Sequence, residues 1–235
     1  MKKYIPNSIT LLNLISGFIA TIFASKGYIG EACFFIMAGM VFDFADGFSA
    51  RLLKAYSDIG KELDSLADVI TFGVAPGAIL FFLLTGNGLQ DVPAIILASA
   101  LPAASALRLA KFNNDTEQST SFKGMATPAS AFTVVAFVIA SLYSDYALFD
   151  SLLYSGWFVT GLSIFLAVMM LTNLRMFSLK FSHLRFKGNE ERYLFAAVSV
   201  LLVVLLRLAS APLIMISYIL ISLIFNTVRR PGTMA

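Results

Sequence analysis

Apolar segments long enough to cross a membrane recur along the whole chain, and they limit the folds available to it. We count eight of them, at 8–25, 30–52, 61–84, 92–110, 127–144, 153–173, 193–208 and 210–227. A helix needs about 20 apolar residues to cross the roughly 30 Å of hydrocarbon in a bilayer. Only 13% of the residues are charged, against about 25% in a soluble domain. The sequence therefore predicts an all-α, polytopic membrane helix bundle.

The spans suggest one integral membrane domain over residues 1–235. The last two, within 193–227, are short and are separated only by a turn around Pro212, so they could form one helical hairpin. Residues 174–192 are rich in lysine, arginine and glutamate, and we interpret them as a solvated cytoplasmic loop. Cys33 is the single cysteine, which excludes an intramolecular disulfide and a cysteine metal cluster. We expect Cys33 to be a small core residue.

Positive residues are distributed asymmetrically over the predicted loops. With an even number of spans, all of the 17 lysines and arginines except Lys26 and Arg207 fall on one side of the membrane. Cytoplasmic loops carry an excess of such residues, so we expect both termini in the cytoplasm and the protein in the inner, cytoplasmic membrane. The net charge of +3 fits contact with anionic lipid head groups. No basic-aromatic module predicts nucleic-acid binding.

Four of the 14 acidic residues fall together near the predicted cytoplasmic ends of the second and third spans. They are Asp43, Asp46, Asp64 and Asp68. The first two are three residues apart and the last two are four apart, so each pair projects from one helical face. A charged side chain in the membrane costs about 2.5–3.5 kcal/mol and usually faces a polar cavity or a partner. Because a short link joins the two spans, the two pairs can converge on one point.

Four carboxylates at one point repel one another unless a cation neutralises them. Carboxylate oxygens are the ligands that Mg²⁺ and Mn²⁺ prefer, and Mg²⁺ commonly joins carboxylates to substrate phosphates. A site with two divalent cations and a pyrophosphate would satisfy these charges. Gly47 and Gly60 leave room for a group close to the backbone. Arg51 lies on nearly the same face as Asp43, where it could bind phosphate oxygens.

The acidic segment resembles the signature of the CDP-alcohol phosphatidyltransferase family, D-x2-D-G-x2-A-R-x8-G-x3-D-x3-D. The chain matches every fixed position, namely Asp43, Asp46, Gly47, Ala50, Arg51, Gly60, Asp64 and Asp68. Eight constraints between residues 43 and 68 are specific, whereas a lone D-x2-D-G would be weak. The resemblance implies a six-helix core and a reaction in which an alcohol displaces CMP from a CDP-linked lipid. It also implies a homodimer.

The resemblance assigns a role to the matched positions. It implies that Asp43, Asp46 and Asp64 ligate two divalent cations. Asp68 would complete the second metal site and act as general base on the attacking hydroxyl. The positions expected to contact the CDP group, two of them in the opening segment 6–10, are Asn7, Thr10, Gly47, Ala50, Arg51 and Ser57.

Three further segments, at 68–76, 106–113 and 122–129, resemble stretches typical of the phosphatidylserine synthase subfamily. The resemblance thus covers roughly residues 6–130, the catalytic signature region. It predicts transfer of a phosphatidyl group from CDP-diacylglycerol to L-serine. We expect Arg108, Lys111 and Asn113, at the cytoplasmic end of the fourth span, to bind the serine carboxylate and phosphate. Lys111 stands where the subfamily usually has arginine, so it lacks the planar fork of a bidentate contact.

Other interpretations stay open. The acceptor could be glycerol phosphate or inositol phosphate, and the lipid an archaeal ether lipid. An intramembrane prenyltransferase also uses aspartate-rich helices and Mg²⁺, but its acidic motifs lie far apart in sequence. A cation transporter would explain buried carboxylates but not Gly47, Ala50 and Arg51 at these spacings. Alternatively, the carboxylates could form salt bridges with Arg51, Lys54 and Lys61 in a helical hairpin.

Overall fold

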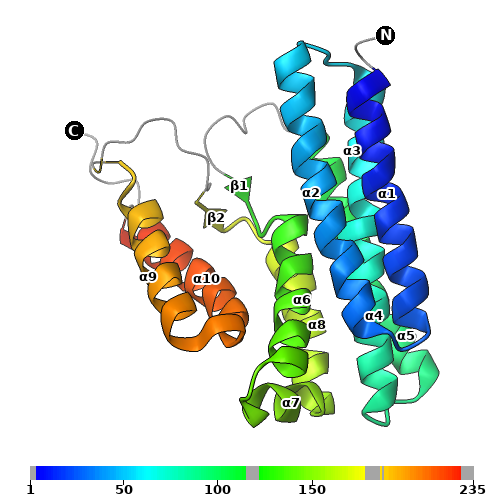
Figure 1. Cartoon of the computed structure of the whole chain (residues 1–235), viewed down its shortest axis with the longest axis vertical. Helices are drawn as coiled ribbons and strands as arrows, with labels where there is room; N and C mark the ends of the chain where they lie inside the picture. Colours follow the sequence, from blue (N-terminus) through cyan, green and yellow to red (C-terminus); the bar gives the residue numbers. More distant parts are fainter. Residues whose placement is uncertain (1–3, 115–121, 178–185, 187, 229–235) are drawn as a thin grey trace.

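The structure of the chain is a computed structural model that describes residues 4–114, 122–177, 186 and 188–228. Almost all of these residues are helical, as predicted (Figure 1). The elements are α1 (Tyr4–Ser25), α2 (Ile29–Leu53), α3 (Asp58–Asp68), the π-helix η1 (Val69–Val74), α4 (Ala75–Gly86), α5 (Asp91–Asn114), β1 (Phe122–Lys123), α6 (Thr127–Tyr143), α7 (Ala147–Leu153), α8 (Gly156–Leu171), β2 (Arg175–Met176), α9 (Glu190–Leu206), the 3₁₀ helix η2 (Arg207–Ala209) and α10 (Ser210–Val228).

Each predicted span coincides with helix, but the count of eight differs from the structure. By length and composition, five helices of the described chain can cross a membrane, or six if α7 and α8, which are bent by 77°, form one span. The shortfall has two causes. With 17 residues, α6 is short for a span, and α9 and α10 belong to one apolar stretch, 190–226. Of the predicted loop 174–192, residues 178–185 and 187 lie outside the described residues.

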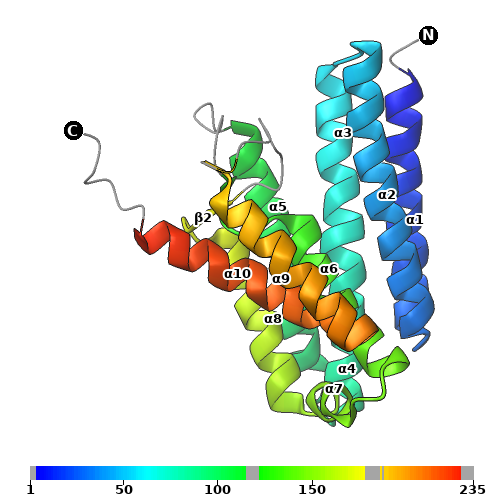
Figure 2. The same ribbon diagram turned by 60° about the vertical axis from the view of Figure 1, so that its left-hand side comes forward.

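The helices α9 and α10 fold back on each other as a hairpin (Figures 1 and 2). The chain reverses at Arg207, whose φ of 50° is unusual for a residue other than glycine. Pro212 in the first turn of α10 suits a helix start, because proline cannot continue a preceding helix. The hairpin lies on the side of α6 opposite α1 and α2, and α10 packs directly on α6.

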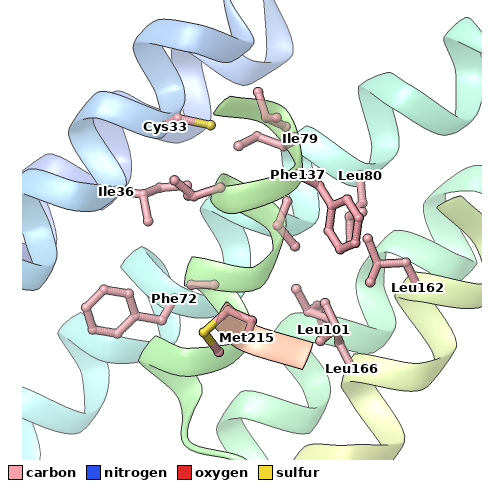
Figure 3. Packing of buried hydrophobic residues seen from close by; sticks show 14 of the residues in the cluster. Cys33, Ile36, Phe72, Ile79, Leu80, Leu101, Phe137, Leu162, Leu166 and Met215 are labelled. Carbon is pink, nitrogen blue, oxygen red and sulfur yellow. The ribbon is translucent and has the colours of Figure 1, made fainter. Parts of the chain in front are cut away.

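The core joins all parts of this bundle. Figure 3 shows side chains from α2, α4, α5, α6, α8 and α10 meeting in one cluster. Phe72 of η1 and Leu101 of α5 are fully buried, and Met215 of α10 belongs to the same cluster. Cys33 is buried and unpaired by any disulfide, as expected for a core residue. The C-terminal helix is therefore part of the packed body rather than an appendage.

A short antiparallel pair, β1 with β2, ties the segment before α6 to the end of α8. The amide of Gly124 donates to the carbonyl of Leu174 at 2.8 Å, and that of Met125 donates to Met169 at 2.9 Å. Gly124 has a φ of +74°, and a Cβ there would lie 2.6 Å from the carbonyl oxygen of Met170. Both facts require glycine at this position.

Candidate active site and metal centre

The structure brings three of the four signature carboxylates together. Asp43 lies in α2, and Asp64 and Asp68 lie in α3. One carboxylate oxygen from each falls within 4.8 Å of the others. Both helices pack against α1, near the end of the molecule that holds the N terminus and the α2–α3 link (Figure 1). Asp43 therefore lies close to Asp64 and Asp68, which are at least 21 residues further along the chain, because the chain reverses direction between α2 and α3.

Asp46 approaches the same cluster from the next turn of α2. It is buried, and its Oδ2 accepts a 2.5 Å hydrogen bond from the hydroxyl of Thr10 in α1. Asp46 interacts electrostatically with both Asp64 and Asp68. Thr10 supplies a hydrogen bond but no charge. A positively charged group is therefore still needed to offset the mutual repulsion of the carboxylates.

The donor set fits divalent cations. All four ligand candidates are carboxylates, the hard oxygen donors that Mg²⁺ and Mn²⁺ prefer. Within the described chain, Oδ1 of Asp64 is buried and has no hydrogen-bond partner, a cost that a bound cation would remove. The neighbouring bases bind backbone oxygens: Nε of Arg51 donates to Gly47 at 3.0 Å, and Nζ of Lys61 donates to Asn113 at 3.0 Å.

A cavity of about 790 Å³ opens beside the cluster, between α1, α2, the α2–α3 link and the start of α3. This volume suits a nucleotide-sized ligand. Its walls contain most of the site residues predicted from the sequence, namely Asn7, Thr10, Asp43, Asp46, Gly47, Ala50, Arg51, Ser57 and Asp64. Residues from three helices and a link thus share one space.

Two glycines shape this cavity differently. A Cβ on Gly47 would meet no atom within 4 Å, so this glycine faces open space. A Cβ on Gly60 would lie 3.0 Å from Oγ of Ser57 and 3.1 Å from Oδ1 of Asn7, so Gly60 permits close packing. Ser57 is the N-cap of α3, and its Oγ accepts a hydrogen bond from the amide of Gly60 at 3.1 Å. A helix N-terminus therefore faces the cavity, an arrangement that favours anions.

The three residues predicted to bind the acceptor end up in different surroundings. Arg108 is 8% exposed, lies within electrostatic reach of Asp68, and has an Nε without a hydrogen-bond partner in the described chain. Lys111 is exposed in the last turn of α5. Nδ2 of Asn113 donates to Oγ of Ser65 at 2.8 Å, which fastens α5 to α3. Of the three, Arg108 is the buried residue that interacts electrostatically with a signature carboxylate.

Sequence reasoning assigned no role to two residues that interact with Asp68 or with Arg108. Asn13 of α1 donates from Nδ2 to Oδ1 of Asp68 at 3.4 Å. Tyr218 of α10 lies within electrostatic reach of Arg108, and its hydroxyl donates to the carbonyl of Phe177 at 3.0 Å. A signal for Asn13 was present, because Asn7, Thr10 and Asn13 recur every three residues and so lie towards one side of a mostly apolar helix.

Comparisons with known proteins give the family of the chain. The model of the CDP-alcohol phosphatidyltransferase family matches residues 3–172, which include the carboxylate cluster and the cavity. The family uses divalent cations, in keeping with the donor set.

Among curated relatives, a CDP-diacylglycerol–serine O-phosphatidyltransferase of Bacillus subtilis is 40% identical over 135 residues, covering 57% of this chain and 74% of the relative. One from Helicobacter pylori is 34% identical over 172 residues, covering 72% and 70%. An archaetidylserine synthase of Methanothermobacter thermautotrophicus is 29% identical over 143 residues, covering 60% of each chain. A CDP-diacylglycerol–serine O-phosphatidyltransferase of Saccharomyces cerevisiae is 36% identical over 156 residues, covering 60% of this chain and 54% of the relative. With the family pattern matched over most of its length and its signature carboxylates gathered at one point, this membrane-embedded chain belongs to the CDP-alcohol phosphatidyltransferase family.

Proposed function

We propose that the chain is a phosphatidylserine synthase, which transfers a phosphatidyl group from CDP-diacylglycerol to L-serine and releases CMP. The observation that carries this proposal is a cluster of carboxylates with a buried, incompletely paired arginine beside it. The cluster suits a pyrophosphate with its cations, and Arg108 suits the carboxylate of an amino-acid acceptor. Relatives named as serine phosphatidyltransferases support the same acceptor.

The metal site would consist of Asp43, Asp46, Asp64 and Asp68 holding two divalent cations, Mg²⁺ or Mn²⁺. Such cations neutralise a pyrophosphate and stabilise the charge that develops on the leaving CMP. The hydrogen bond from Thr10 orients Asp46 for this task.

The nucleotide would occupy the cavity beside the cluster. Gly47 and Ala50 provide a surface without long side chains, and Arg51 lies at its edge to bind phosphate oxygens. Asn7, Thr10 and Ser57 add polar groups from the opposite wall. The two acyl chains would remain in the surrounding hydrocarbon, beside exposed apolar side chains of α2 such as Phe44 and Phe48.

In the reaction, the serine hydroxyl oxygen attacks the lipid-side β-phosphorus of CDP-diacylglycerol. Asp68 accepts the hydroxyl proton as the new P–O bond forms. The bond from phosphorus to the bridging oxygen breaks, and CMP leaves with that electron pair. Arg108 holds the serine carboxylate, while Lys111 and Asn113 remain candidates at the same end of α5, the latter already engaged with Ser65.

We further propose that the protein lies in the inner membrane with both termini and the active site on the cytoplasmic side, and that it is a homodimer. The distribution of lysine and arginine over the loops supports the orientation. The family resemblance supports the dimer.

The test is CMP release by purified protein in detergent with CDP-diacylglycerol and Mn²⁺ or Mg²⁺. Parallel reactions contain L-serine, glycerol 3-phosphate, inositol phosphate or no acceptor, and a CDP-linked ether lipid tests the archaeal alternative that one relative suggests. Asp68→Asn should abolish release, whereas Asp91→Asn, an exposed acid in the first turn of α5, should not. Release with another acceptor and not with serine would overturn the serine assignment.

Arg108 offers a sharper test of the acceptor. Arg108→Lys keeps a positive charge but loses the planar fork that matches a carboxylate. We expect KM for serine to rise by about tenfold, the effect of losing about 1.4 kcal/mol, with KM for CDP-diacylglycerol unchanged. Equal increases in both KM values would show that Arg108 does not bind the acceptor specifically.

A further inference from the structure

Asn13 is a polar residue that the predicted mechanism leaves without a role, although it contacts the proposed general base. It is fully buried in α1, and its Nδ2 donates to Oδ1 of Asp68. The distance of 3.4 Å is longer than the usual 2.7–3.2 Å or so. Catalytic hydrogen bonds are often long without substrate and tighten when it binds.

The fold holds Asn13 in place from two sides. Thr71 of η1 donates from its hydroxyl to the carbonyl oxygen of Asn13 at 2.9 Å. On the other side, a Cβ on Gly39 of α2 would lie only 3.0 Å from Oδ1 of Asn13 and 2.4 Å from Cγ2 of Thr71. The small residue at position 39 therefore creates the niche that Asn13 and Thr71 fill.

The backbone next to Asp68 has an unusual conformation. The π-helix Val69–Val74 begins directly after Asp68, and π-helical turns occur mostly as short insertions in α-helices, frequently at functional sites. The wider turn brings Thr71 against α1, as its bond to Asn13 shows. Asn13 is thus bonded both to the Asp68 side chain and to the segment that follows Asp68 directly.

The amide of Asn13 can serve Asp68 in only one orientation. Turned over, it would place its oxygen against a carboxylate, which repels it. In the observed orientation Oδ1 is buried and has no hydrogen-bond partner among the described residues, an arrangement that costs stability. A buried polar group that carries such a cost points to a use in function.

We propose that Asn13 is a positioning residue that orients the Asp68 carboxylate for proton transfer, a role that rests on the proposed function. As a neutral donor, it fixes the carboxylate without supplying a positive charge that would compete with a cation. A lysine or arginine in its place would neutralise Asp68 instead. The niche and the bond from Thr71 hold Asn13 in place, so that its hydrogen bond can give the Asp68 carboxylate a fixed direction.

The test compares Asn13→Ala and Asn13→Leu with wild type in CMP release, and measures thermal unfolding with and without Mn²⁺. Leucine keeps the shape of asparagine but cannot donate a hydrogen bond. The leucine variant therefore still tests the proposal if the alanine variant fails to fold. Ser16→Ala is the matched control, because Ser16 is buried in the same helix and its hydroxyl bonds to Leu12 of that helix.

Both Asn13 variants should lower kcat by about 10- to 100-fold, the usual effect of removing a group that orients a ligand or base. KM for serine should change less than about twofold, and the rise in Tm caused by Mn²⁺ should persist. A kcat within about twofold of wild type, or loss of the Mn²⁺ effect on Tm together with kcat, would overturn the proposal. Absence of CMP release by the wild type with every acceptor would instead overturn the proposed function, and this inference with it.

Discussion

Replacing Gly47 by alanine should affect the activity of the protein without destabilising its fold. Gly47 is an exposed glycine inside α2, and its side-chain position faces the cavity beside the carboxylates. Replacement by alanine adds one methyl group to the space proposed for the pyrophosphate and nucleotide.

The expected effects on stability and activity have opposite signs. An added Cβ meets no protein atom within 4 Å, and alanine is favoured over glycine in a helix by about 0.5–1 kcal/mol. Gly47→Ala should therefore fold at least as well as wild type. With substrate against the backbone, the methyl should cost about 1–3 kcal/mol of overpacking, which corresponds to a loss of about 5- to 160-fold in kcat/KM for CDP-diacylglycerol.

The assay measures CMP release and Tm for Gly47→Ala beside Gly17→Ala. At Gly17 a Cβ would lie 2.3 Å from Oγ1 of Thr71 and 2.6 Å from its Cα, so α1 would have to move away from η1 and Tm should fall. A Gly47→Ala protein with wild-type kcat/KM would show that no substrate approaches this position. A lower Tm for it would refute the reasoning about open space.

Three further predictions concern single contacts and the metal. Thr10→Val removes the hydrogen bond to Asp46, which is worth about 1.5–3 kcal/mol for a charged acceptor. The Mn²⁺ concentration for half-maximal CMP release should therefore rise about tenfold. An unchanged concentration would contradict a role for Thr10 in the metal site. Tyr218→Phe removes the hydrogen bond to Phe177 at a cost of about 0.5–1.5 kcal/mol, which should lower Tm. Tyr154→Phe, at an exposed position, should leave Tm unchanged. Equal Tm values for the two variants would refute a stabilising role for the Tyr218 hydroxyl. Removal of divalent cations with EDTA should abolish CMP release and lower Tm, and added Mn²⁺ should restore both; release that survives EDTA would contradict a metal-dependent reaction.

The helical bundle and the composition of the site can both be predicted from the order of the residues. Apolar length predicts helices in a membrane because backbone groups there must bond within their own segment. The spacing of Asp64 and Asp68 places both on one face of a helix, and the short link after α2 requires α2 and α3 to be neighbours. These inferences depend on local geometry, which a single sequence contains.

The contacts that the supporting polar groups make with the cluster could not be predicted in this way. Thr10 meets Asp46, 36 residues away, and Asn13 meets Asp68, 55 residues away, each on a different helix. Such contacts depend on the rotation and spacing of packed helices, which small residues such as Gly39 set. The π-helix after Asp68 has no local signature, because it follows from packing against α1 and α5.

The residues predicted to bind the acceptor show the same difference between what the sequence determines and what the tertiary structure determines. Arg108, Lys111 and Asn113 look alike in sequence, as polar groups at the end of an apolar helix. In the folded chain Arg108 is buried near Asp68, Lys111 is exposed, and Asn113 bonds to Ser65. Their faces follow from helix periodicity, but what each face meets depends on how α5 packs against α3 and η1. That is a property of the assembled bundle, in which distant segments compete for the same space.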